Sequence, residues 1–166
     1  MYEIGDYIIK AVHGLCRVED IVHLDMSGAD KSTLYYLLIP VNDQKDKVYM
    51  PTEKAAVKTR KAMTEEEAWN LIHRINEIDE LTIENENVRE QRYKETIRGG
   101  NPESLVGIIK MTYIRNKKRE DAGKKGTAMD ERYFELAENN LYSELAFALN
   151  KSKEDISDLI WREYQS

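Results

Sequence analysis

The chain has 166 residues, enough to bury a core in one domain or in two small ones. Its 8 glycines and 3 prolines exclude a collagen-like or low-complexity protein, and no apolar run approaches the roughly 20 residues that cross a bilayer. No basic-then-apolar signal segment opens the chain, and the single Cys16 cannot form an internal disulfide. We therefore expect a cytosolic protein that does not bind membranes.

Charge is distributed unevenly along the chain, although the net charge is −6. Residues 86–126 contain 11 Lys or Arg against 6 Asp or Glu, a surplus of five positive charges, whereas 61–85 and 127–166 are acidic. A basic block between two acidic ones can present a local positive face to an anionic partner. The alternative is a set of solvated helix faces with no partner.

The first sixty residues predict strands joined by short turns. Strands are expected at 7–12, at 15–22 with imperfect alternation, at 33–41 and at 47–50, with a turn at 25–32. The 33–41 run is apolar on both parities, as in a central strand covered on both faces, and Pro51 stops the last strand. Together these elements favour a small, bent antiparallel sheet or barrel.

After Ala62 the apolar period becomes helical. Thr64 and Glu67 form a capping box, and Asn101 followed by Pro102 is an N-cap with proline at the first helical position. The expected helices begin near Thr64, span 86–98, run from Pro102 to about Arg119, and begin again after Thr127 and after Ser152. A loop is expected at 122–126. The fold class is therefore α+β: a small antiparallel β domain at 1–62, then an all-α domain of about five helices at 63–166.

No catalytic motif stands out, so we expect neither an enzyme nor a bound cofactor. His13, Cys16 and His23 match no zinc spacing, and packing roles in strands and turns explain them better. No metal site is predicted.

Basic residues gather on two predicted helices. Arg89 and Arg92 share one helix face, and Arg115, Lys117, Lys118 and Arg119 end the next helix before a loop that contains Lys124. Such clusters can follow a phosphate backbone with little sequence readout. The alternative for the second cluster is that cations complement the helix dipole, which leaves the loop lysines unexplained. Tyr93, beside Arg92, is expected to pack against its neighbours rather than to stack on a base.

Four stretches, in their order and spacing, resemble the CarD family over nearly the whole chain. They are the opening strand with His13-Gly14, the pair Tyr35-Tyr36-Leu37-Leu38 and Val48-Tyr49-Met50-Pro51, Arg92-Tyr93-Lys94 before Gly99-Gly100, and Ala137 to Ala146. The first sixty residues also resemble the polymerase-interacting domain of the transcription-repair coupling factor. Departures are Ala11 in place of a proline, Cys16 in place of a glycine, and Arg89 in place of a tryptophan that wedges into the promoter bubble.

The resemblance implies a monomeric transcription regulator. An SH3- or Tudor-like β domain would bind the β subunit of bacterial RNA polymerase, and the helical domain would contact promoter DNA, mostly independently of sequence, and alter open-complex stability. The implied polymerase-binding residues are Leu24, Tyr36, Tyr49, Met50 and Pro51. The candidate DNA-binding residues are Arg89, Arg92, Lys94, Lys117, Lys118 and Lys124. The alternatives are a polymerase-bound adaptor whose helical domain binds another protein, and an RNA-binding module.

Overall fold

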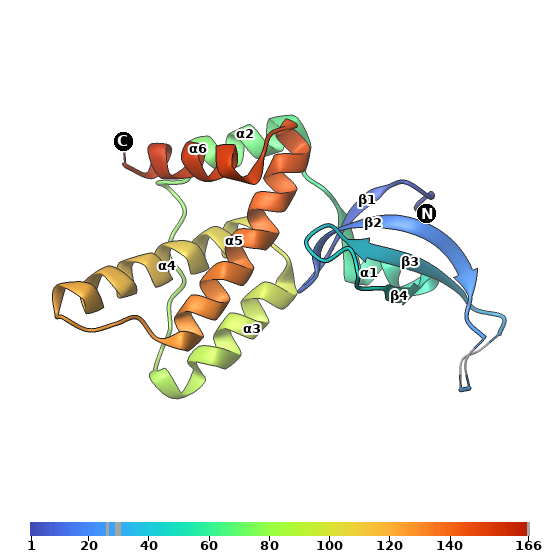
Figure 1. The fold of residues 1–166 in the computed structure, drawn as a ribbon, viewed down its shortest axis with the longest axis horizontal. Helices are drawn as coiled ribbons and strands as arrows, with labels where there is room; N and C mark the ends of the chain where they lie inside the picture. The colour runs from blue at the N-terminus through green and yellow to red at the C-terminus, as the bar shows by residue number, and fades with distance from the viewer. Residues whose placement is uncertain (26, 29–30, 166) are drawn as a thin grey trace. The chain divides into compact units, whose positions relative to one another are not determined.

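The computed structural model describes residues 1–25, 27–28 and 31–165, so Met26, Ala29 and Asp30 of the predicted 25–32 turn lie outside the described residues. It divides into two compact units, Met1–Ala62 and Met63–Ser166, which we call the β domain and the helical domain. The first is a five-stranded antiparallel sheet and the second is helical, which confirms the α+β fold class (Figure 1).

The sheet has the strand order β4-β3-β2-β1-β5. Its strands are β1 (Tyr7–Lys10), β2 (Gly14–His23), β3 (Leu34–Pro40), β4 (Val48–Pro51) and β5 (Thr59–Lys61). The short β5, which pairs with β1, was not predicted, nor were the 3-10 turn Thr52–Lys54 and the helix α1 (Ala55–Lys58) before it. β4 ends at Pro51, as predicted, and Pro51 is itself the last strand residue, which is tolerated because β4 is an edge strand and needs fewer backbone donors.

The imperfect alternation of the second strand has a structural cause. The β2–β3 register shifts between Val18 and Asp20, so an extra residue bulges there and the side chains beyond it change faces. Before the shift, Cys16 and Val18 point into the core of the β domain. Burial raises the pKa of the Cys16 thiol to about 12.

The β1–β2 hairpin turns at Val12, which has φ of +72°. A β-branched side chain in this left-handed region is strained, by roughly 1–2 kcal/mol. Val12→Gly should therefore stabilise the β domain by about 0.5–1 kcal/mol, after subtracting the greater entropy of glycine in the unfolded chain. Amide hydrogen exchange along β2 measures this gain.

Val57→Gly is the matched control, because Val57 is 88% exposed and lies in the right-handed helix α1. The same substitution there should destabilise the domain by about 0.5–1 kcal/mol. If Val12→Gly slowed exchange no more than Val57→Gly, the hairpin would carry no strain.

Five α-helices lie in the described part of the helical domain, as predicted. They are α2 (Glu65–His73), α3 (Arg89–Gly99), α4 (Pro102–Asp121), α5 (Ala128–Leu149) and α6 (Lys153–Gln165). The capping box of Thr64 with Glu67 is present, and Asn101 and Thr127 cap α4 and α5 as predicted. The second helix differs at its start, since residues 86–88 form a separate 3-10 turn before α3.

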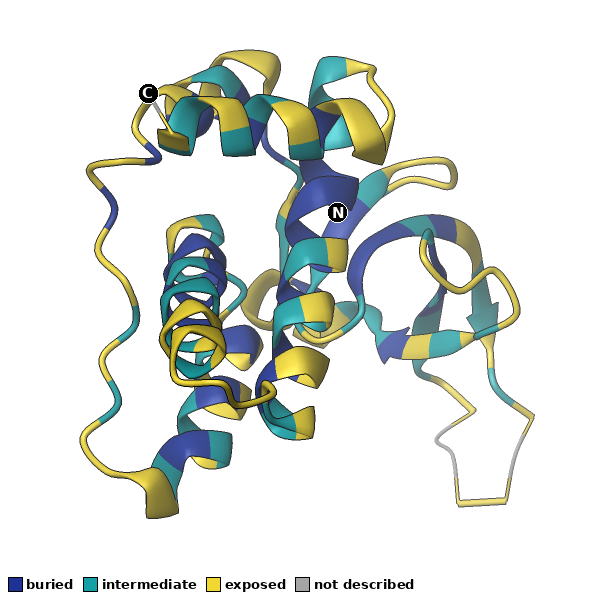
Figure 2. Ribbon diagram, turned by 60° about the vertical axis from the view of Figure 1, so that its left-hand side comes forward, coloured by how far each residue is buried: buried dark blue, intermediate teal, exposed yellow. Residues whose placement is uncertain are grey.

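The core of this domain is formed by apolar faces of all five helices. Ala137, Leu141 and Leu145 of α5 are fully buried, and dark buried stretches alternate with exposed ones along the helices in Figure 2. Trp69 and Trp161 are partly buried and pack against this core. None of the described helices is long and apolar enough to cross a membrane.

Residues 79–83, between α2 and α3, lie along α4 without helix or strand. The backbone N–H of Leu81 donates to the carbonyl of Gly107 at 3.0 Å, and Lys110 Nζ donates to the carbonyls of Ile75 (2.6 Å) and Ile78. A Cβ at position 107 would lie 3.1 Å from the carbonyl oxygen of Asp79, so any side chain there requires this backbone to shift by a few tenths of an ångström. These contacts fix residues 79–83 over α4 as one wall of a groove.

Candidate functional site

Two adjacent strands at one edge of the sheet present a row of half-exposed apolar side chains. Tyr35 lies opposite Pro51 and Leu37 lies opposite Tyr49 in the β3–β4 register, so all four share one face. Tyr49 is 41% exposed and the other three are half-buried. We call Tyr35, Leu37, Tyr49 and Pro51 the β3–β4 outer face. Within the described residues β4 pairs with β3 alone and forms an edge of the sheet, and the outer side of an edge strand presents backbone groups that can pair with another chain.

Two of the predicted polymerase-binding side chains lie on the opposite face of these strands. Tyr36 and Met50 pair with each other and are 1% and 2% exposed in the core of the β domain. The Tyr36 hydroxyl accepts a hydrogen bond from the Tyr2 backbone at 3.0 Å. This corrects the prediction, because a one-residue step along a strand reverses the face, and Tyr36 and Met50 are on the inner parity. Tyr49 and Pro51 lie on the outer face, where a partner can contact them.

Leu24 lies one residue beyond β2 and is half-buried. Sequence reasoning missed Tyr35 and Leu37. The alternation along β4 that places Tyr49 outward could have indicated them through pairing with β3. However, the 33–41 run is apolar on both faces, so the sequence does not show which face of β3 is exposed.

Arg89, expected to touch DNA, is instead 8% exposed inside the helical domain. Its guanidinium donates twice to the Glu86 carboxylate, at 2.8 and 2.9 Å, and once to the Tyr93 hydroxyl at 3.0 Å. The Tyr93 hydroxyl in turn donates to Asp130 at 2.7 Å. This corrects the prediction for Arg89, because every part of its charged end is bound within the protein.

A second arginine completes this cluster. Arg115 Nε donates to Asp130 at 2.6 Å and its Nη1 donates to Glu86 at 2.9 Å, so two arginines share two carboxylates. We call Glu86, Arg89, Tyr93, Arg115 and Asp130 the arginine network. It joins α3 and the turn before it to α4 and α5, and its two positive and two negative charges cancel.

The network shifts the pKa values of its carboxyl groups. The hydrogen bond from Arg89 is the main cause that lowers the pKa of Glu86 to about 2. At Asp130, burial raises the pKa, but hydrogen bonds from Tyr93, Arg115 and Thr127 outweigh it, and the net shift is downward. Both groups therefore stay ionised at neutral pH and hold the arginines in place.

The other predicted basic residues differ in how far the chain neutralises them. Arg92 lies 3.7 Å from both Glu84 and Glu95, and Lys94 lies 3.6 Å from Glu90. Lys117, by contrast, is exposed over the Tyr113 ring. Lys118 and Lys124 are exposed and form no ion pair with any residue that the structure describes. The available positive charge therefore lies at the C-terminal end of α4 and in the following loop.

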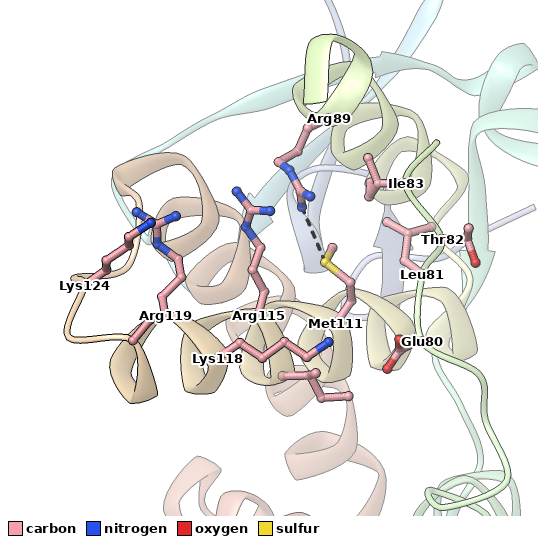
Figure 3. A pocket seen from close by; sticks show the side chains of 12 residues that line it. Glu80, Leu81, Thr82, Ile83, Arg89, Met111, Arg115, Lys118, Arg119 and Lys124 are labelled. Atoms are coloured by element: carbon pink, nitrogen blue, oxygen red, sulfur yellow. Dashed lines mark hydrogen bonds between the residues drawn. The ribbon is translucent and has the colours of Figure 1, made fainter. Parts of the chain in front are cut away.

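A groove of about 530 Å³ borders this basic end. One wall is the segment Glu80 to Ile83, and the other is the C-terminal half of α4 (Figure 3). Met111, Arg115 and Lys118 line it at helical spacing, and Lys124 reaches it from the loop. Sequence reasoning found the cations but missed the groove, because its facing wall comes from a segment without periodicity.

Metal chemistry finds no support among the described residues. No three His, Cys, Asp or Glu side chains gather there in a way that could hold an ion.

Residues 2–63 match the family described as the CarD-like/TRCF RID domain, which spans the β domain. No curated protein matches the chain significantly.

Proposed function

Since residues 2–63 belong to the CarD-like/TRCF RID domain family, the chain is an RNA polymerase-interacting protein of transcription, and we propose that it docks on the β subunit of the bacterial enzyme. The observation that supports this most directly is the free edge of β4 beside the β3–β4 outer face. An extended segment of the polymerase would pair with the β4 backbone, while Tyr49 and Leu37 supply apolar contact. The protein would act in the cytosol as a monomer.

The helical domain, in this proposal, contacts promoter DNA through the end of α4. Lys117, Lys118 and Lys124 supply charge that no carboxylate of the described chain neutralises. Contacts with phosphates give affinity that is largely independent of sequence and falls with salt. If the protein binds the open promoter complex more tightly than the closed one, the equilibrium shifts toward the open complex. The protein then acts by binding alone, with neither catalysis nor cofactor.

Retention of purified RNA polymerase core by the immobilised full chain tests the docking. Tyr49→Asp places a charge in the centre of the outer face and should reduce retention at least about tenfold, since losing a buried aromatic contact costs 2 kcal/mol or more. Val57→Asp is the control, because Val57 is 88% exposed in the same domain but lies on α1. Equal retention of the wild type and Tyr49→Asp would exclude this face as the docking surface.

A second candidate function is an adaptor that binds polymerase through the β domain and another protein through its helices. The observation in its favour is that Arg89, Arg92 and Lys94 of α3 are all paired with carboxylates of this chain. The two candidates differ in DNA affinity. Binding to a promoter duplex that weakens steeply with salt favours the regulator, whereas negligible binding at low salt favours the adaptor.

A further inference from the structure

Apolar side chains on both sides of the groove beside α4 form a surface, here called its apolar floor, that no other part of the described chain covers. Leu81 and Ile83 line one wall and Met111 lines the other (Figure 3). Ile114 of α4 also lines the groove. Leu81, Ile83 and Ile114 are each half-buried. Burial of such side chains against a ligand is favourable because it removes their remaining apolar surface from water.

Three positively charged side chains from the end of α4 and the following loop lie beside these apolar residues. Lys118, Arg119 and Lys124 line the groove, and no carboxylate of the described residues forms an ion pair with them. Arg119 donates its Nε to the carbonyl of Lys125 at 2.8 Å, which holds the loop but leaves its charge unbalanced. The neighbouring Arg115 is neutralised within the arginine network. The groove therefore combines apolar side chains with three cations from α4 and the following loop that are unpaired within the described residues, while Glu80 places one carboxylate on the facing wall.

The wall at Thr82 and Ile83 adds backbone groups. Within the described residues, neither of these two makes a backbone hydrogen bond, and both belong to a stretch without helix or strand. Their N–H and C=O groups can pair with an extended chain laid beside them.

We propose that this groove binds an acidic, aliphatic segment of a partner protein in extended form. The inference rests on the adaptor candidate and names the surface that it would use. Aliphatic side chains of the segment would pack on Ile83 and Ile114, and its carboxylates would meet Lys118 and Lys124, with bidentate pairing possible at Arg119. A single-stranded nucleic acid fits less well, because none of the twelve residues that line the groove is aromatic and no ring can stack on a base.

Fluorescence anisotropy with a fluorescein-labelled peptide of alternating glutamate and leucine tests the proposal on the full-length protein. The matched probe alternates glutamate with serine and has the same charge. The leucine peptide should bind at least about tenfold more tightly, because each leucine buries apolar surface on the floor. Equal binding of both peptides would overturn the proposal, since the groove would then act only as a positive surface.

Charge reversal locates the site. Lys118→Glu combined with Lys124→Glu should weaken the leucine peptide at least about tenfold by replacing attraction with repulsion at two contacts. Lys117→Glu is the control, because Lys117 is the neighbouring residue on α4, lies over Tyr113 and does not line the groove. Ile83→Ser should remove the preference for leucine over serine without altering charge. An equal loss in Lys117→Glu, or displacement of the peptide by an oligothymidylate at equal charge, would assign the surface to nucleic acid instead.

The failure of this proposal is distinguishable from failure of polymerase docking. The peptide assay contains no polymerase, and the groove variants leave the β3–β4 outer face unchanged. A protein that retains polymerase but prefers neither peptide would keep the docking proposal and lose only this one.

Discussion

Replacing Asp130 by alanine is expected to lower the free energy of unfolding of the helical domain by about 3–5 kcal/mol, the cost of leaving a buried charge without its partner. Asp130 is 6% exposed and accepts hydrogen bonds from Tyr93 at 2.7 Å and from Arg115 at 2.6 Å. Its removal leaves one carboxylate, Glu86, for two arginines, of which Arg89 is buried.

Urea unfolding followed by tryptophan fluorescence measures this loss. Both tryptophans, Trp69 and Trp161, lie in the helical domain, so the signal reports that domain alone. Lys94→Ala is the control, because its ion pair with Glu90 is exposed and should contribute only about 0–1 kcal/mol. A loss in Asp130→Ala no larger than that of Lys94→Ala would show that the arginine network does not stabilise the fold.

Acid should weaken the same network. The folded-state pKa of Glu86 is lowered from its usual 4.5 to about 2, so its contribution is fully present above pH 4.5 and is lost as the pH falls toward 2. The pKa of Asp130 is shifted in the same direction. The stability of the wild type should therefore decline over this window more than that of Asp130→Ala, which has already lost one of these carboxylates.

The buried arginine shows where sequence reasoning about this helix stops. The i, i+4 spacing of Arg89 and Tyr93 is visible in the sequence and places both on one face of α3. What decides their environment is Asp130, a buried residue in the first turn of α5, which reaches them only through tertiary packing. The basic face of this polar helix led us to predict that Arg89 contacts DNA. In the fold, Arg89 is instead buried within a cluster of ion pairs.

The helical elements were predictable for a local reason. Capping side chains act within three residues of the helix start, so Thr64, Asn101 and Thr127 can be recognised without knowing the fold. The strands β1 to β4 were also recognisable from composition. The short β5 was not, because its residues Thr-Arg-Lys have no apolar pattern and its pairing with β1 depends on long-range contact.

The β3–β4 outer face could be predicted only in part. The sequence identified both strands and Tyr49, but not which parity of β3 faces outward. The register resolves this, since Leu38, Tyr36 and Met50 share the inner core while Leu37 pairs with Tyr49. A resemblance to a family transfers positions along a strand, and only the register tells which of those side chains a partner can reach.

Replacing Gly107 by valine is expected to lower the stability of the helical domain by about 2–3 kcal/mol, as for overpacking of a close contact. A Cβ at 107 would already lie 3.1 Å from the Asp79 carbonyl oxygen and 3.3 Å from the Leu81 nitrogen, and both are backbone atoms. The branches of valine require the 79–81 segment to move away, which breaks the hydrogen bond from Leu81 to the Gly107 carbonyl.

Gly99 offers the comparison, because nothing lies within 4 Å of a Cβ built there and it too is helical. Gly99→Ala should be neutral or stabilising by up to about 1 kcal/mol through helix propensity, whereas Gly107→Ala should lose that gain to the backbone contact. Urea unfolding of the two alanine variants and of Gly107→Val, followed by tryptophan fluorescence, gives the order of their stabilities.

Gly107→Val also links the fold to the groove, since Leu81 and Ile83 form its wall only while residues 79–83 stay on α4. Gly107→Val should therefore also weaken binding of the glutamate–leucine peptide under conditions where the domain remains folded. Unchanged peptide binding in a destabilised Gly107→Val would mean that the segment plays no part in the groove.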